Sequence, residues 1–145
     1  MEQDIGNRVY TLESGAVVNV TVSEYEDAKA LYDCFVMAFM AANGIDADMG
    51  SMNLIRVLIA ASASKDMERA LFKCAERAVY NRDGVDWKVG KTLFDTPGIG
   101  LKARGDYHVL MAKIAEANIA PFIQALFSLL KMVPALKKAD SPPLS

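Results

Sequence analysis

The stretch from residue 106 to 135 constrains the fold most, because its apolar residues recur at helical spacing and its second half is almost entirely apolar. Between residues 119 and 136 the strongly polar side chains are Gln124, Ser128 and Lys131. At positions i, i+4 and i+7 of a helix, these three form one thin polar stripe, and apolar side chains cover the remaining surface. We therefore expect either that the domain surrounds this helix or that part of it contacts another protein.

The same apolar run is a poor candidate for a membrane span. Its 18 residues are near the lower limit for a helix that crosses a bilayer. Gln124 and Lys131 lie within the run, and Pro121 and Pro134 lie near its two ends. Charged and amide side chains are costly in the bilayer interior. We therefore expect no membrane partner.

The length of the chain predicts a single domain. A chain of 145 residues is long enough to bury a core of its own, and we place the domain at residues 1–136. Residues 137–145 hold two lysines and two prolines and few apolar groups, so we expect a disordered tail.

The net charge of -2 gives no reason to expect a nucleic-acid partner. The two cysteines lie in apolar helical patterns and no export signal is evident, which favours a reduced, cytosolic setting.

The amino-terminal part predicts a β-hairpin followed by a helix. Residues 8–12 and 16–22 are rich in Val, Thr and Tyr and flank Gly15, so we expect the hairpin at about residues 8–22. Ser23 and Glu26 match the Ser-x-x-Glu capping box and predict that a helix begins there. The Asn43-Gly44 pair predicts its end.

The middle of the chain predicts two more helices and then turns. Ser51 begins an apolar segment that continues to residue 59, and residues 65–80 alternate apolar and charged groups at helical spacing. Residues 81–84, Asn-Arg-Asp-Gly, indicate a turn. Residues 85–93 fit either a short strand pair or a loop.

The long carboxy-terminal helical stretch is expected to begin at Leu101 or Lys102, after the break at residues 95–98. Pro121 lacks an amide donor and its ring crowds the preceding turn, so the helix should kink or restart near residues 118–120. These elements together predict a mainly α fold: a small helical domain with an amino-terminal β-hairpin and a long, proline-kinked carboxy-terminal stretch.

Two motifs resemble nucleotide-binding signatures and fail on geometry. Residues 84–92 end in Gly-Lys-Thr, but five residues separate the glycines where a phosphate loop has four. Pro97 follows Thr92 within five residues, which leaves no room for the long helix that a phosphate loop opens. The Asp-x-x-Gly of residues 95–98 is too close to lie on a separate strand. We expect two loop turns and no nucleotide cofactor.

The remaining reactive residue types form no catalytic or metal-binding constellation. His108 is the only histidine, no cysteine lies at ligand spacing, and a solvated position on a helix fits it better. Cys34 and Cys74 occupy core positions of helical ridges, so we expect both to be buried and inert. Asp46 and Asp48 lack the further oxygen ligands of a Ca²⁺ loop. We expect neither an enzyme nor a metal site.

About half of the chain carries a family resemblance, spread in order over five segments. These segments are Ala70-Leu71-Phe72-Lys73-Cys74-Ala75-Glu76-Arg77, Tyr80-Asn81, Leu93-Phe94-Asp95, Ala103-Arg104-Gly105-Asp106-Tyr107 and Glu116-Ala117-Asn118-Ile119-Ala120-Pro121-Phe122. In these segments the chain resembles the tail assembly chaperones of long-tailed (siphovirus-type) bacteriophages.

The resemblance implies a non-enzymatic, mostly helical protein made in the host cell cytoplasm. Such chaperones coat the long, helix-rich tape measure protein, help to recruit tail tube subunits around it, and are generally absent from the mature virion. The resemblance thus implies three partners: the tape measure protein, the tail tube protein and further copies of the chain. A structural head-tail connector or neck component is the alternative, since it would also be small, acidic and oligomeric.

The apolar carboxy-terminal stretch is where we expect client contact. An amphipathic client helix needs apolar helical surface, and leucine and methionine adapt to varied partners. The candidate contact residues are Phe122, Leu126, Phe127, Leu130 and Met132. The same face could instead belong to the core or to a self-association surface, because apolar helical stripes usually pack internally.

Overall fold

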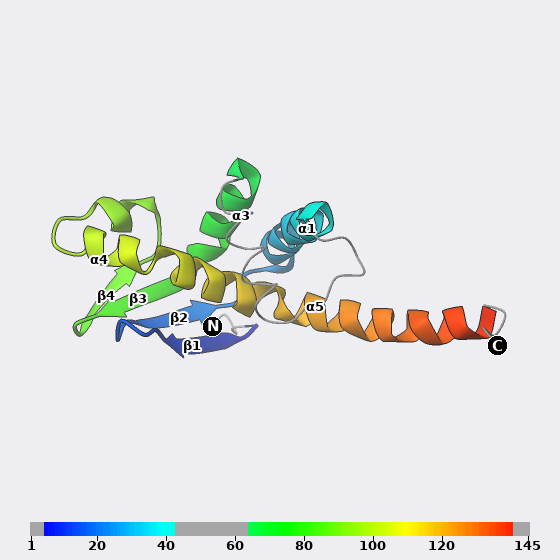
Figure 1. The fold of residues 1–145 in the computed structure, drawn as a ribbon. Helices are drawn as coiled ribbons and strands as arrows, with labels where there is room; N and C mark the ends of the chain where they lie inside the picture. Colours follow the sequence, from blue (N-terminus) through cyan, green and yellow to red (C-terminus); the bar gives the residue numbers. More distant parts are fainter. Residues whose placement is uncertain (1–4, 43–63, 141–145) are drawn as a thin grey trace.

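The computed structural model describes residues 5–42 and 64–140, which form an α+β fold with helices over one face of a four-stranded antiparallel sheet (Figure 1). The prediction of a mainly α domain with only a hairpin is therefore wrong. The predicted hairpin is confirmed as two of the four strands, and residues 78–88 supply the other two. The predicted helix at residues 51–59 lies outside the described residues.

The sheet has the order β1-β2-β3-β4, with every neighbouring pair antiparallel. Its strands are β1 (Asn7–Thr11), β2 (Val17–Thr21), β3 (Ala78–Arg82) and β4 (Val85–Lys88). The β1–β2 connection contains Gly15 at a φ of 91°, a left-handed conformation that glycine adopts without steric cost. β3 crosses back from a distant part of the chain to pair with β2.

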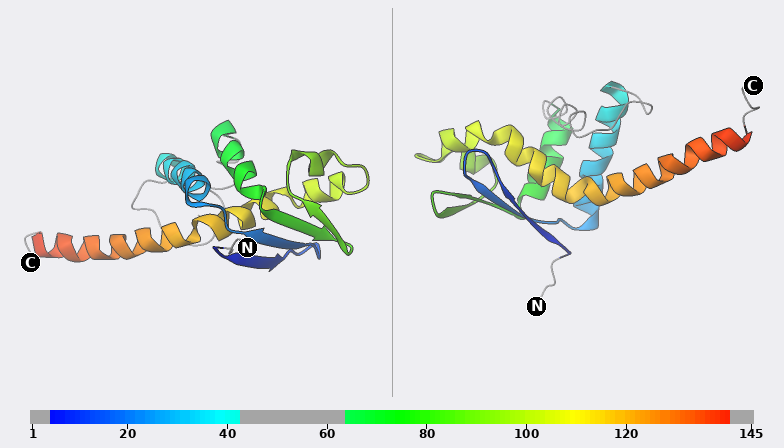
Figure 2. Two further views of the ribbon diagram at one scale, coloured as in Figure 1. Left: turned by 180° about the vertical axis from the view of Figure 1, so that it is seen from behind. Right: turned by 60° about the horizontal axis from the view of Figure 1, so that its bottom comes forward.

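The described helices are α1 (Tyr25–Ala42), α3 (Lys65–Ala75), α4 (Gly100–Gly105) and α5 (Tyr107–Asp140), with a 3-10 helix, η1, at Lys91–Asp95. α5 contacts β1 and β2, and α1 and α3 pack beside it and against each other (Figures 1 and 2). The first part of α5 therefore lies between the sheet and the other long helices. Ser64 caps α3 by accepting the amide of Met67.

The third predicted helix ends earlier than the sequence pattern suggests. We expected a helix through Tyr80, but α3 ends at Ala75 and residues 78–82 form β3. Ala78 and Tyr80 are buried and the residues between and after them are half-buried, which is strand alternation. The predicted turn at residues 81–84 is confirmed, with φ of 55° at Asp83 and 80° at Gly84, and residues 85–88 form the returning strand.

The two faces of the sheet differ in polarity. The inner face contributes the buried side chains of Val18, Val20, Ala78 and Tyr80 to the core. On the outer face, Asn7 donates to Asn19 and Thr21, and Asn81 donates to Asp86 at 2.7 Å. An antiparallel sheet with one packed and one solvated face shows this alternation.

α5 is one helix of 34 residues that runs through Pro121 and Pro134. It bends where its colour passes from yellow to orange, near Pro121 (Figure 2, right), in agreement with the predicted kink but without the predicted restart. The helix begins at Tyr107, later than predicted, because α4 forms a separate turn before it. It reaches Asp140, so residues 137–140 are helical where a disordered tail was expected. Residues 141–145 lie outside the description.

Candidate functional site

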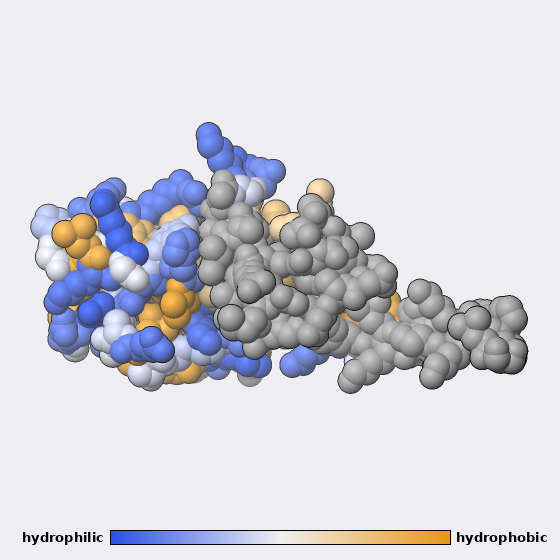
Figure 3. All heavy atoms as spheres, in the orientation of Figure 1, coloured by the Kyte–Doolittle hydropathy of each residue, from blue (hydrophilic) through white to orange (hydrophobic). Residues whose placement is uncertain are grey.

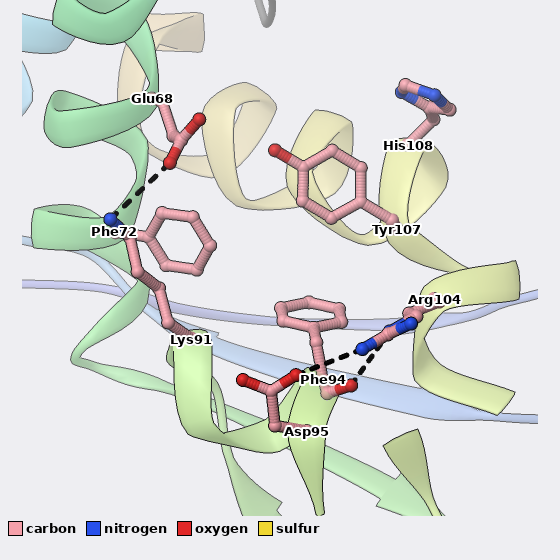
Figure 4. A pocket seen from close by; sticks show the side chains of 8 residues that line it. All are labelled: Glu68, Phe72, Lys91, Phe94, Asp95, Arg104, Tyr107 and His108. Atoms are coloured by element: carbon pink, nitrogen blue, oxygen red, sulfur yellow. Dashed lines mark hydrogen bonds and ion pairs between the residues drawn. The ribbon is translucent and has the colours of Figure 1, made fainter. Parts of the chain in front are cut away.

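A groove lies between α3, η1, α4 and the start of α5, and we call it the aromatic groove (Figure 4). Its volume is about 400 Å³. Eight residues line it, three of them with aromatic rings on its floor and five with charged or imidazole side chains at its rim: Glu68, Phe72, Lys91, Phe94, Asp95, Arg104, Tyr107 and His108. These residues come from four elements that the sheet and α5 hold together.

The floor of the groove is a chain of edge-to-face ring contacts. Phe72 of α3 meets Phe94 of η1 with ring centroids 6.2 Å apart, and Phe94 meets Tyr107 of α5 at 5.5 Å. Edge-to-face pairs at such distances are attractive. Burial, followed by the nearby Glu68 charge, raises the pKa of the Tyr107 hydroxyl, which therefore stays neutral at physiological pH. These rings give the groove a neutral, apolar floor.

The charged groups of the groove are paired with one another. Lys91 Nζ lies 3.5 Å from Glu68 Oε1, and Arg104 Nη2 lies 2.9 Å from Asp95 Oδ1. Arg104 Nε also donates to the Phe94 carbonyl oxygen at 2.9 Å, which holds η1 against α4. The lysine ammonium lies over the Phe72 ring at 5.6 Å. A rim of paired charges is suited to contact with a polar protein surface more than to proton transfer.

The Gly-Lys-Thr segment, residues 90–92, contributes Lys91 to the aromatic groove. Gly90 precedes η1, which has only five residues, so no long helix follows the glycine-containing loop. A phosphate loop needs such a helix, because its amino-terminal amides and dipole hold the phosphates. Lys91 instead pairs with Glu68 and covers Phe72. This geometry agrees with the interpretation of the motif as a loop turn.

The single histidine and the two cysteines lie apart from one another. His108 is exposed at the rim of the aromatic groove, beside the Tyr107 ring, as expected for a solvated position. Cys74 is fully buried, and burial raises the pKa of its thiol to about 11. Cys34 is only half-buried, which differs from the prediction, and burial raises its thiol pKa too. Within the described residues no cluster of three His, Cys, Asp or Glu side chains forms. Asp46 and Asp48 lie outside them.

Asp106 forms a buried polar centre that the sequence did not indicate. Its Oδ2 accepts hydrogen bonds from Ser14 Oγ at 2.9 Å, Tyr80 Oη at 2.6 Å and Arg82 Nη1 at 3.1 Å. Asp106 separates α4 from α5. Its carboxylate joins the hairpin turn and β3 to this junction. We assign the centre a structural role.

The predicted client-contact residues begin where α5 leaves the body of the domain. Phe122 is half-buried and packs on α1, with its ring 5.0 Å from that of Tyr32 and 6.1 Å from that of Tyr25. Leu126, one turn further, is half-buried. Phe127, Leu130 and Met132 also belong to α5, but the structure describes only their backbone and not their side chains.

Beyond Ile123 the helix extends away from the other described helices and strands, and we call residues 124–140 the α5 arm (Figures 1 and 2). Ile123 is 8% exposed and is the last buried residue among the described side chains of α5. Further along, Gln124, Ala125 and Ser128 are exposed, and Leu129 is 57% exposed. Figure 3 shows that the described surface of the body is mainly hydrophilic.

The described part of α5 also meets the length and hydropathy of a membrane span. The stretch Tyr107–Leu126 has a mean hydropathy of 1.3, and 44% of it is buried inside the protein. A core helix of a soluble protein has the same properties, so this observation is weak evidence for a membrane.

With this geometry in view, comparison of the chain with models of protein families, with curated proteins and with solved structures found no match.

Proposed function

We propose that this chain is a tail assembly chaperone of a long-tailed bacteriophage, which binds the tape measure protein and helps to recruit tail tube subunits in the host cell cytoplasm. The observation that carries the proposal is the α5 arm, a helix with an apolar sequence that continues past Ile123, the last buried residue among the described side chains of α5, on a folded α+β body. The family resemblance implies that the protein bound by the arm is the tape measure protein. The folded body holds the first part of α5 in place.

The proposed mechanism is contact between helices. A tape measure protein is a long amphipathic helix, and its apolar stripe would aggregate if left bare in water. The sequence of the α5 arm contains leucine, phenylalanine and methionine, and the half-buried side chains of Phe122 and Leu126 lie where the arm leaves the body of the domain. Helix-in-groove contacts of this kind are made by apolar residues at i, i+3, i+4 and i+7. The proposed activity includes no covalent reaction.

Co-expression with a tape measure protein tests the proposal. We expect the chain to raise the soluble fraction of the tape measure protein several-fold, and Leu129→Glu to abolish this effect, because it places a charge on exposed apolar surface of the arm. Ser128→Glu is the matched control, since it adds the same charge at the neighbouring exposed position on the polar stripe. A tape measure protein that stays insoluble with the unmodified chain would contradict the proposal.

The location of the chain after assembly separates this proposal from a connector or neck component. We expect purified virions to lack the chain, whereas a head-tail connector would be present at a fixed copy number. Quantitative mass spectrometry of virions and of infected-cell lysates makes this comparison.

A further inference from the structure

The free edge of β1 has backbone groups that no other described element of the protein uses. β1 ends the strand order β1-β2-β3-β4, and no described helix or strand lies beside it on the side away from β2 (Figures 1 and 2). The amide of Val22 donates to Gly6, and that of Leu12 donates to Ala16. In an antiparallel ladder, hydrogen-bonded pairs alternate with non-bonded pairs, so every second residue of β1 turns its amide and carbonyl outward. These residues are Asn7, Val9 and Thr11.

The two edges of the sheet differ in how they are protected. At the other edge, the amide of Val89 donates to Ala78, so the outward-facing residues of β4 are Asp86 and Lys88. Both are charged and exposed, and charged side chains commonly protect edge strands from pairing. The outward-facing residues of β1 are uncharged, and Val9 is 59% exposed. The β1 edge is therefore the one that is open to a further strand.

α5 borders this edge on the inner face of the sheet. Lys113 Nζ lies over the Tyr10 ring of β1 at 5.1 Å, and Val109, one turn earlier on α5, is 48% exposed. Tyr10 Oη is buried and has no hydrogen-bond partner within the described residues. A strand added beside β1 would therefore meet apolar surface and an unused hydroxyl group on its inner side.

The charge on this side of the edge is positive. Arg8 lies on the same face of β1 as Tyr10, is exposed, and forms no ion pair within the described residues. Lys113 pairs with Glu116 at 3.3 Å. Burial and then the Glu116 charge raise the pKa of Tyr10, and the Arg8 charge opposes them. Two cations and one carboxylate thus surround the tyrosine, and Arg8 is the cation without a partner.

We propose that the β1 edge binds an extended, acidic segment of another protein as an additional antiparallel strand. The segment has an acidic residue opposite Arg8 and an apolar residue opposite Tyr10, both on the inner face, and a β-branched residue opposite Val9 on the outer face. In such strand addition, main-chain hydrogen bonds supply the affinity and alternate side chains supply the specificity. This edge is separate from the α5 arm, so the inference goes beyond the proposed function.

Charge disfavours a second copy of the chain in this position. Two β1 edges in contact would bring the Arg8 and Lys113 side chains of both copies together, with one Glu116 in each copy to offset them. Like charges that face each other across a strand pair are destabilising. An acidic residue opposite Arg8 supplies the charge that this edge lacks.

A short peptide is the probe for this site. In the blocked peptide Thr-Leu-Val-Glu-Thr, an antiparallel pairing places the leucine opposite Tyr10, the valine opposite Val9 and the glutamate opposite Arg8. We expect saturable NMR shifts of the outward-facing β1 amides in the full chain, and their hydrogen exchange to slow about threefold at saturating peptide. The outward-facing amides of β4 should not change. Absence of these shifts would overturn the proposal, and so would protection that grows with protein concentration without peptide, because a second copy would then occupy the edge.

Charge exchange tests the predicted specificity. Arg8→Glu should weaken binding of this peptide about fivefold, and a peptide with lysine in place of its glutamate should restore binding. Lys88→Glu is the matched control, because it makes the same charge change at the β4 edge, and it should leave the affinity unchanged. Equal losses in the two variants, or no rescue by the lysine peptide, would overturn the proposal.

A proline substitution tests the main-chain contact. Val9→Pro removes an amide that faces away from the sheet, so we expect it to abolish peptide binding with the fold intact. Binding that survives in the folded proline variant would overturn strand addition, and the charge exchange decides the proposal if this variant does not fold. Because these experiments use no tape measure protein, their failure is distinguishable from a failure of the proposed function.

Discussion

At the scale of single residues, Asp106 connects the most distant parts of the chain. One carboxylate oxygen accepts from Ser14 in the hairpin turn and from Tyr80 and Arg82 on β3, while the backbone of Asp106 divides α4 from α5. The residue is only 8% exposed, so these partners replace the water that the charge has lost. The hydrogen bonds to Asp106 therefore hold the sheet against the helical layer.

Replacing Asp106 by Asn tests this role. The change removes the charge that the Tyr80 and Ser14 hydroxyls contact, and hydrogen bonds to a charged group contribute about 1.5 to 3 kcal/mol each. We expect the free energy of unfolding to fall by about 2 kcal/mol, measured by urea denaturation. Asp95→Asn is the matched control, because Asp95 also pairs with an arginine but has a side chain that is 77% exposed. A loss as large in the control would contradict a special role for Asp106.

Cys74 makes stability depend on alkaline pH. Burial raises the thiol pKa from 9.0 to about 11, so the folded state keeps the proton where the unfolded state has lost it. This contribution is fully present below pH 9 and is lost as the pH rises toward 11, a loss of about 2 kcal/mol. We expect the free energy of unfolding of Cys74→Ala to fall less steeply between pH 9 and 11 than that of the unmodified chain. Equal slopes would argue against a buried, neutral thiol.

At the scale of elements, the sequence predicts those whose signals are local. Gly15 between two Val- and Thr-rich runs indicated the hairpin, and Asp83-Gly84 indicated the second turn. The pairing of β3 with β2 was missed, because Ala78 and Tyr80 fit both the helical ridge of α3 and the buried face of a strand. Only the contact with the distant β2 decides between them.

Only part of the candidate site could likewise be predicted from the sequence. The apolar stretch of α5 is evident from the sequence, but the aromatic groove needs Phe72, Phe94 and Tyr107 to meet from three elements. No spacing in the sequence encodes that meeting. The Asp106 centre was missed for the same reason, since Ser14 is 92 residues away from it.

Asn118 attaches α5 to the rest of the molecule. Its Oδ1 accepts a hydrogen bond from the amide of Ser23 at 2.7 Å, and its Nδ2 donates to the carbonyl oxygen of Ile114, two turns before Pro121, at 2.8 Å. The Ser23 hydroxyl, expected to cap α1, donates to the Cys74 carbonyl oxygen instead. The β2–α1 connection is thereby fixed to both α3 and α5.

We expect Asn118→Ala to lower the free energy of unfolding by about 1 to 3 kcal/mol, because the buried amide of Ser23 loses its acceptor. Thermal and urea unfolding measure the change. Gln124→Ala alters a similar amide on the same helix at an exposed position and should have little effect. If both substitutions cost the same, helix propensity and not the lost hydrogen bond would explain the result.

At the scale of the whole molecule, a compact body and a projecting arm differ in how their apolar side chains are covered. The body has its own core, whereas the described side chains of the arm are exposed or half-buried. The self-association that the family resemblance implies would bury this surface of the arm. Stability that depends on association changes with protein concentration, because binding to the folded state adds to the free energy of unfolding by mass action.

We therefore expect the melting temperature to rise with protein concentration, by several degrees between about 1 and 100 µM, in differential scanning fluorimetry. Leu129→Glu should remove this dependence, because it places a charge on exposed apolar surface of the arm, and Ser128→Glu should keep it, because Ser128 lies on the polar stripe. A melting temperature that is independent of concentration for the unmodified chain would mean that the arm does not associate.

The polar outer face of the sheet has a consequence for any assembly of this protein. Asn7, Asn19 and Asn81 make side-chain hydrogen bonds on this face, although Val9 on the same face is 59% exposed. A mainly polar face that is already in contact with water gains little from being covered. We therefore expect copies of the protein to associate through the helical side, and the outer face of the sheet to stay in contact with solvent.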